Sequence, residues 1–98
     1  VLDAKYKKLE SYEKVSKVNR NDLHQLITYI TNLHASKGVF IAPLSERQQI
    51  IPKSRLKNSS ASLYILGVEI CHTSTSYADF CEKMKAKEVY FVDTLRQL

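Results

Sequence analysis

The sequence has few of the residues that mark several common classes of protein. Two glycines, two prolines and no tryptophan occur among its 98 residues, which argues against a low-complexity chain or a flexible linker. No apolar run approaches the roughly 20 residues that a membrane-spanning helix needs. No basic segment followed by a short apolar one indicates a signal peptide. What remains, 44% hydrophobic and 26% charged residues, predicts one small domain over residues 1–98 with one modest core.

Cysteine is equally scarce. Cys71 and Cys81 are the only two; their spacing fits no zinc or redox motif, and one pair is too few for a disulfide framework. We expect two reduced, partly buried thiols. Free thiols favour a cytoplasmic protein. Without a long apolar run, no contact with a membrane is expected.

Charge is unevenly distributed along the chain. Residues 1–60 contain eleven Lys or Arg and five Asp or Glu, whereas residues 61–98 contain four and five. A basic half beside a nearly neutral one indicates a surface that faces a polyanion, although surplus lysines can also serve solubility alone. The candidates for phosphate contacts are Lys7, Lys8, Lys14, Lys17, Arg20, Lys53, Arg55 and Lys57. Each of them, taken singly, is equally well explained as a solvated loop residue.

The pattern of apolar residues predicts three strands and two helices. The predicted elements are strands over residues 1–6, 39–44 and 63–71 and helices over residues 21–36 and 76–97. Residues 45–62 are polar and basic, and should form a protruding loop or an irregular hairpin arm. The order strand, helix, strand, basic loop, strand, helix is that of an α/β or α+β layered domain.

Local signals refine these elements. Asn21 is the expected N-cap of the first helix and Gly38 its C-terminal stop. Pro43 places the end of its strand near a sheet edge or a bulge, and Ser76 with Asp79 resembles a capping box. The face of the last helix that should be buried contains Tyr77, Phe80, Cys81, Met84, Phe91, Val92 and Leu95.

Asp3 and Lys5 are the first candidate site residues. Side chains two positions apart on a strand point to the same face, about 6–7 Å apart. A carboxylate there can hold Mg²⁺, and an ammonium can orient a water or stabilise charge on a phosphate. Asp3-Ala4-Lys5 is the only acid-x-Lys triplet in the chain. On spacing alone, a surface ion pair worth about 0–1 kcal/mol is the simpler interpretation.

Gln25 and Tyr29 are the second pair of candidates. They are four residues apart on the first predicted helix, so they share one face beside its apolar stripe. They are either an ordinary pair at the boundary of the buried face or a polar pair aimed at Asp3 and Lys5.

The order of these motifs resembles that of a known nuclease superfamily. VLDAKYKK, then NDLHQLITYI, then VFIAPL resemble the PD-(D/E)XK nucleases, in particular their RecB-like and McrC-like branches. The similarity is closest to the C-terminal nuclease region of McrC-type restriction subunits. It covers residues 1–44 in motif and the rest of the chain in element order only.

The resemblance implies a fold, an activity and a set of roles. The chain would be the C-terminal portion of a restriction-endonuclease-like core, belonging to a DNA endonuclease that uses Mg²⁺ or Mn²⁺. Asp3 would bind the metal with the Ala4 carbonyl as a further ligand, Lys5 would be the catalytic lysine, and Gln25 and Tyr29 would support them. The family's remaining Asp would lie upstream of Val1, so residues 1–98 are expected to be inactive alone. An NTP-hydrolysing partner subunit is also implied.

Two other interpretations of the sequence stay open. The chain can be a non-catalytic nucleic-acid-binding or assembly module with a nuclease-like fold, since the basic first half suits it equally well. It can also be a small α/β interaction domain whose charge only keeps it soluble. Charge does not separate DNA from RNA, and the apolar side of a thin sheet leaves room for a homodimer.

Overall fold

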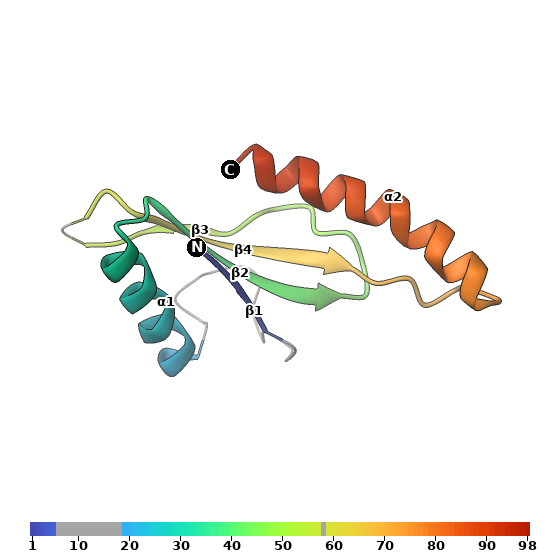
Figure 1. Cartoon of the computed structure of the whole chain (residues 1–98), viewed down its shortest axis with the longest axis horizontal. Helices are drawn as coiled ribbons and strands as arrows, with labels where there is room; N and C mark the ends of the chain where they lie inside the picture. The colour runs from blue at the N-terminus through green and yellow to red at the C-terminus, as the bar shows by residue number, and fades with distance from the viewer. Residues whose placement is uncertain (6–18, 58) are drawn as a thin grey trace.

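A four-stranded sheet with one helix on each face organises the chain (Figure 1). The computed structural model describes residues 1–5, 19–57 and 59–98. In chain order the elements are β1 (Leu2–Ala4), α1 (Arg20–Leu33), β2 (Lys37–Leu44), β3 (Lys53–Arg55), β4 (Ser62–Glu69) and α2 (Tyr77–Arg96). The layered α/β class is confirmed. The prediction of three strands is wrong by one, because the basic segment contains β3.

The strand order in the sheet is β1-β2-β4-β3. β1, β2 and β4 are parallel, whereas β3 is antiparallel to β4 and forms the hairpin arm expected within residues 45–62. Parallel neighbours need crossovers on a face of the sheet, and α1 supplies the one between β1 and β2. β1 and β3 are therefore the two edges of the described sheet.

Two small cores lie on the two faces of the sheet. Phe40 and Ile65 pack with Leu26 of α1 on one face, and all three are 0% exposed. Val39, Tyr64 and Leu66 are buried on the other face. They pack against Phe91 and Leu95 of α2 and against Leu98, which follows that helix. Because β2 and β4 are covered on both faces, their sequences are almost continuously apolar.

The ends of α1 differ from the predicted ones. Its N-cap is Asn19, whose side-chain oxygen accepts hydrogen bonds from the backbone N–H of Asn21 at 2.9 Å and of Asp22 at 3.5 Å. The helix ends at His34, in the left-handed conformation at φ 52°. Gly38 lies inside β2 instead, where a Cβ would come within 2.5 Å of Ile30 Cδ1. That glycine allows a close approach of helix and strand and does not cap the helix.

α2 begins with the predicted cap. Ser76 Oγ accepts from the Asp79 N–H, and the Asp79 carboxylate accepts from the Thr75 N–H, both at 3.1 Å. Phe80, Cys81, Met84, Phe91 and Leu95 are buried or half-buried as expected. The prediction is wrong for Tyr77 and Val92, which are 83% and 39% exposed. The first turn of α2 lies beyond the end of the sheet (Figure 1), and Val92 is turned about 100° from Phe91 around the helix axis.

The cysteines bear out the expectation of partly buried thiols. Cys71 is buried, Cys81 is half-buried, and both are free. In the described part of the chain, no helix is both long enough and apolar enough to cross a bilayer.

Pro43 limits the pairing of β1 with β2. The Val39 N–H donates to the Val1 carbonyl and the Lys5 N–H to the Ile41 carbonyl, both at 2.8 Å. The next bond of this parallel ladder would need an N–H at residue 43, which proline lacks. The ladder therefore stops at Lys5, while on its other side Pro43 still lies opposite Val68 of β4. Pro43 was expected near a sheet edge or a bulge. β2 is instead an inner strand, but its pairing with β1 ends at Ile41, two residues before the proline.

Gly67 offers a test of the packing around β4. A Cβ at this position would overlap Cγ and Cδ1 of Leu44, and overpacking of this kind costs about 1–3 kcal/mol. We expect Gly67→Ala to lower the free energy of unfolding by that amount in urea titrations. In a Leu44→Ala background the same substitution should be nearly neutral; an equal loss in both backgrounds would contradict the proposed clash.

Candidate functional site

The side of β1 that faces α1 contains the candidate residues. Strand alternation puts Val1, Asp3 and Lys5 on that side and Leu2 on the opposite one, where it is 54% exposed. Tyr6, expected on the same face as Leu2, lies outside the described residues. Lys5 follows the last residue of β1, where the backbone ladder with β2 ends.

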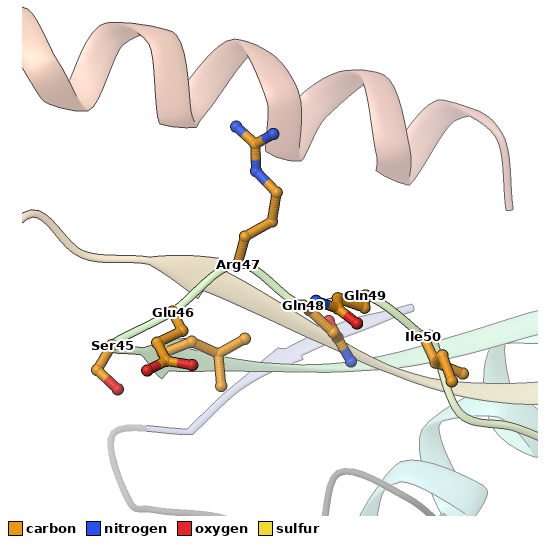
Figure 2. Close-up of a pocket in the computed structure, with 7 residues that line it drawn as sticks. Ser45, Glu46, Arg47, Gln48, Gln49 and Ile50 are labelled. Carbon is orange, nitrogen blue, oxygen red and sulfur yellow. The ribbon is translucent and has the colours of Figure 1, made fainter.

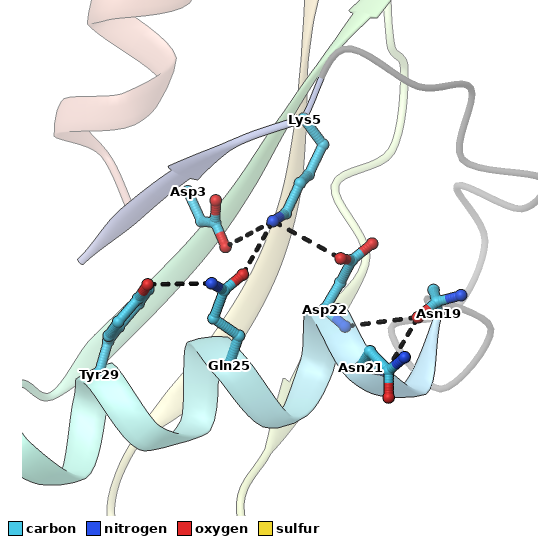
Figure 3. A network of polar contacts seen from close by, with 7 residues as sticks. All are labelled: Asp3, Lys5, Asn19, Asn21, Asp22, Gln25 and Tyr29. Carbon is cyan, nitrogen blue, oxygen red and sulfur yellow. Dashed lines mark hydrogen bonds and ion pairs between the residues drawn. The ribbon is translucent and has the colours of Figure 1, made fainter.

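The Lys5 ammonium lies among polar groups from two elements (Figure 3). Its Nζ donates to Gln25 Oε1 at 3.0 Å and forms ion pairs with Asp3 Oδ2 at 3.4 Å and Asp22 Oδ1 at 3.5 Å. Gln25 Nε2 in turn donates to the Tyr29 hydroxyl at 3.0 Å. The structure thus brings all four predicted side chains into one connected cluster, which we call the Lys5 cluster, and adds Asp22 to it.

Helical geometry explains why α1 supplies three of these groups. Asp22, Gln25 and Tyr29 follow one another at spacings of three and four residues, which places them on one face. Leu26 and Ile30, on the adjoining face, are buried beneath the sheet. The N-cap at residue 19 fixes where the helix starts, so its first turn lies beside Lys5 (Figure 3).

Asp22 was missed in the sequence because only the pair with i,i+4 spacing was considered. The signal that would have found it is its position three residues before Gln25, in the same DLHQ stretch. It is also an acidic residue in the first turn, where the helix dipole favours negative charge.

Burial and charge together determine the state of Lys5. The side chains of Lys5, Asp3 and Asp22 are 18%, 14% and 11% exposed. Partial desolvation by itself lowers the pKa of Lys5, but the carboxylates of Asp3 and then Asp22 outweigh it and raise that pKa above its usual value. Lys5 is therefore a cation at neutral pH. It can stabilise negative charge or orient a water, and it is not suited to act as a general base.

Asp3 offers a carboxylate that could hold a metal ion. Its Oδ2 is buried and has no hydrogen-bond partner among the described residues, its contact with Lys5 being an ion pair. In the ladder, Val1 and Lys5 turn their backbone groups to β2, so those of Ala4 point to the outer edge. Within the described ranges, no three His, Cys, Asp or Glu side chains form a metal-binding group. Mg²⁺ fits this donor set only with water and phosphate oxygens as further ligands.

The basic candidates are distributed differently. Lys53 and Arg55 lie on β3, at the opposite edge of the sheet from Lys5, three strand spacings or about 14 Å away. Lys53 Nζ is 5.6 Å from the Tyr64 ring centroid, and Lys57 is in the turn after β3. Arg20 is exposed at the first residue of α1, near the Lys5 cluster. Lys7, Lys8, Lys14 and Lys17 lie outside the described residues.

A second charged cluster joins the loop after β2 to α2. The Glu69 carboxylate pairs with Lys87 and lies 3.9 Å from Arg47 Nε, and the Arg47 guanidinium lies 4.4 Å from the Tyr90 ring centroid. The hydrogen bond from Lys87 lowers the pKa of Glu69 most; desolvation opposes it, and the charges of Lys87 and Arg47 reinforce it. Glu69 therefore serves as an ion-pair anchor between β4 and α2.

A pocket lies under this loop, away from the Lys5 cluster. It is lined by Leu44 through Ile50, and Figure 2 shows Arg47 leaving it towards α2. Gln48 ties the loop to the edge of β4: its Nε2 donates to the Ile65 carbonyl at 3.1 Å, and its Oε1 accepts from the Gly67 N–H at 2.7 Å. Glu46 and Arg47 are its only charged lining residues, and the Arg47 side chain is engaged outside the pocket by Glu69 and Tyr90. The pocket therefore has no cluster of charged groups comparable to the Lys5 cluster.

Comparison with known proteins gives one match. Residues 1–43 match the family model described as McrBC 5-methylcytosine restriction system component. This segment includes every member of the Lys5 cluster and links the chain to McrBC-type restriction systems. Searches of the curated proteins and of the solved structures found no match. The relation to the PD-(D/E)XK superfamily stays a prediction.

The Lys5 cluster predicts a stability effect. Lys5→Ala should remove one cation from beside two mostly buried carboxylates and lower the free energy of unfolding at pH 7 by about 1–3 kcal/mol. Chemical denaturation of both proteins measures this difference. Lys85→Ala, which removes an exposed lysine of α2, is the matched control and should have no measurable effect. A Lys5→Ala protein as stable as the control would contradict the ion pairs.

Glu69 predicts a pH effect of definite sign. Because its folded-state pKa is lowered, its contribution to stability is present above its unfolded pKa of about 4.3 and is lost as pH falls through the folded value. We expect Glu69→Gln to flatten the fall in unfolding free energy below about pH 4.5, measured by urea titrations from pH 6 to 3. Glu88→Gln, on the exposed side of α2, should retain the wild-type slope. Identical slopes for all three proteins would contradict the role of the ion pair.

Proposed function

We propose that this chain carries part of the catalytic site of a Mg²⁺-dependent DNA endonuclease that acts in a McrBC-type restriction system. The observation that carries the proposal is the Lys5 ammonium, held between Asp3 of its own strand and the Asp22 and Gln25 side chains of α1. The family match over residues 1–43 supports a role in a McrBC-type restriction system. The fold alone would not support a function, since one fold serves many functions.

The proposed roles follow from the chemistry of each group. Asp3 and the Ala4 carbonyl would hold Mg²⁺, which supplies a polarised phosphate oxygen and an activated water when bound. Lys5, a cation at neutral pH, would orient the attacking water and stabilise the charge that develops on the phosphate. Gln25 and Tyr29 would restrict the movement of Lys5, because the hydrogen bond between them fixes the amide oxygen that Lys5 contacts.

The proposed substrate comes from the family description, and the proposed partner from the resemblance to McrC-type restriction subunits. A 5-methylcytosine restriction system acts on modified DNA, so DNA containing this base is the first substrate to test. An NTP-hydrolysing subunit is the proposed partner. Arg20, exposed at the start of α1, would contact the backbone phosphates nearest to Lys5.

A second candidate function is a nucleic-acid-binding module without catalysis. The observation that favours it is the excess of basic residues in the first 60 positions, with Lys53, Arg55 and Lys57 at or near the edge of the sheet opposite Lys5. Such a module would bind DNA in a salt-dependent way, whether or not Asp3 is present.

Cleavage assays separate the two functions. The 98-residue chain and any longer natural chain that contains it would be incubated with Mg²⁺, NTP, the partner subunit and plasmid DNA with or without 5-methylcytosine. We expect cleavage by the longer wild-type chain and not by the 98-residue chain alone. In the longer chain Lys5→Ala should lower the rate by at least about 100-fold, because a charged group that acts on the transition state is removed.

Lys85→Ala is the control and should cleave at the wild-type rate. Circular dichroism would confirm that the Lys5→Ala protein is folded. Equal cleavage by Lys5→Ala and wild type would contradict the proposed site. DNA binding that weakens with salt, without cleavage by any of the proteins, would favour the binding module.

A further inference from the structure

Asp22 is an acidic residue buried at the start of a helix. It is 8% exposed, the only charged residue of the described chain that is buried. A buried carboxylate is costly unless a charge or hydrogen bonds compensate it. Here the compensation includes the Lys5 ammonium, 3.5 Å from Asp22 Oδ1. The arrangement of Asp22 is therefore tied to that of Lys5.

Lys5 is held by two sets of groups of different origin. Asp3 is on β1, which Lys5 directly follows, whereas Asp22 and Gln25 belong to α1. α1 is fixed by its cap at Asn19 and by the buried residues Leu26 and Ile30. Asp22 and Gln25 are thus fixed relative to the sheet, independently of the state of Asp3.

A metal ion at Asp3 would disturb one of these two sets. The oxygen that pairs with Lys5, Asp3 Oδ2, is a buried atom without a hydrogen-bond partner among the described residues. A divalent cation bound to that carboxylate would compete with the ammonium for it and repel it, since like charges a few ångströms apart in a partly buried site interact strongly. Lys5 then needs another anion to stay beside the metal.

We propose that Asp22 is a positioning residue that keeps the Lys5 ammonium in the site when the Asp3 carboxylate is occupied by a metal ion. This role rests on the proposed function, because it presumes a metal at Asp3. It makes Asp22 a partner of the lysine and not a ligand of the metal. Gln25 assists as a neutral acceptor but supplies no charge.

The first experiment observes Lys5 directly and does not depend on cleavage. The 98-residue chain would be labelled with ¹⁵N at the lysine Nζ, and the Lys5 ammonium signal assigned by its disappearance in Lys5→Arg. At low temperature the wild-type signal should persist with and without Mg²⁺. In Asp22→Asn, an isosteric change, the signal should persist without Mg²⁺ and broaden beyond detection when Mg²⁺ is added. A signal that Mg²⁺ leaves unchanged in Asp22→Asn would overturn the role.

The second experiment measures metal binding by the electron paramagnetic resonance of free Mn²⁺. Asp3→Asn should weaken Mn²⁺ binding strongly, as expected for loss of a direct carboxylate ligand, whereas Asp22→Asn, which removes no ligand, should weaken it much less. Asp93→Asn, at an exposed position of α2, is the control. Weakening in Asp22→Asn equal to that in Asp3→Asn would make Asp22 a metal ligand and overturn the positioning role.

Cleavage by the complete system adds a third readout. Asp22→Asn should lower kcat at saturating Mg²⁺ by about tenfold or more with KM for DNA unchanged, and Asp22→Glu should restore part of it. A wild-type chain that binds no Mn²⁺ would overturn the proposed function and this role together. Normal Mn²⁺ binding with full activity in Asp22→Asn would overturn the role of Asp22 alone.

Discussion

The site depends on one ammonium group placed between two carboxylates that belong to different elements. Asp3 is on a strand of only three residues at the edge of the described sheet, and Lys5 directly follows that strand. A pair on such a strand would be weak if it were solvated, because surface ion pairs contribute little. The contact with α1 changes this: it excludes much of the water from Lys5 and adds Asp22 and Gln25. The ion pairs are worth more in this partly buried setting.

Several features of the fold hold α1 close to β1. Gly38 lets Ile30 approach β2 closely, and the buried Leu26 and Phe40 hold the helix on the sheet. Pro43 ends the backbone ladder next to Lys5, at the position where the lysine turns to the helix. On the far face α2 covers β4, and the cluster of Arg47, Glu69 and Lys87 fastens the intervening loop. That second cluster contributes to stability and has no contact with Lys5.

Much of this architecture could be predicted from the sequence, because it rests on local patterns. The alternation of the first five residues and the apolar runs of β2 and β4 gave the layered class, and the cap of α2 was clear from Ser76 and Asp79. The three-residue β3 could not be predicted, because its residues are exposed and its pairing with β4 is a tertiary contact. The stop of α1 was predicted at Gly38 because glycine often follows a helix. Here Gly38 leaves space for Ile30 to pack on β2, and His34 adopts the left-handed conformation that ends the helix.

The candidate site was predictable in part for the same reason. Asp3 and Lys5, and likewise Gln25 and Tyr29, have spacings that place each pair on one face of its own element. That the two pairs meet depends on how α1 packs on β1, which no local pattern determines. Asp22 is recognised only once the contact is known. In the sequence, nothing distinguished Lys53 and Arg55 from the other candidates for phosphate contacts. The strand order places them at the opposite edge of the sheet from Lys5.

The most direct test of this account is a crystal structure of the chain grown with Mn²⁺, using its anomalous scattering to locate the metal. The account predicts a peak about 2.1 Å from an Asp3 carboxylate oxygen, with the Lys5 ammonium still in contact with Asp22 and Gln25. A peak coordinated by Asp22 in place of Asp3, or a Lys5 side chain turned out to solvent beside the bound metal, would contradict it.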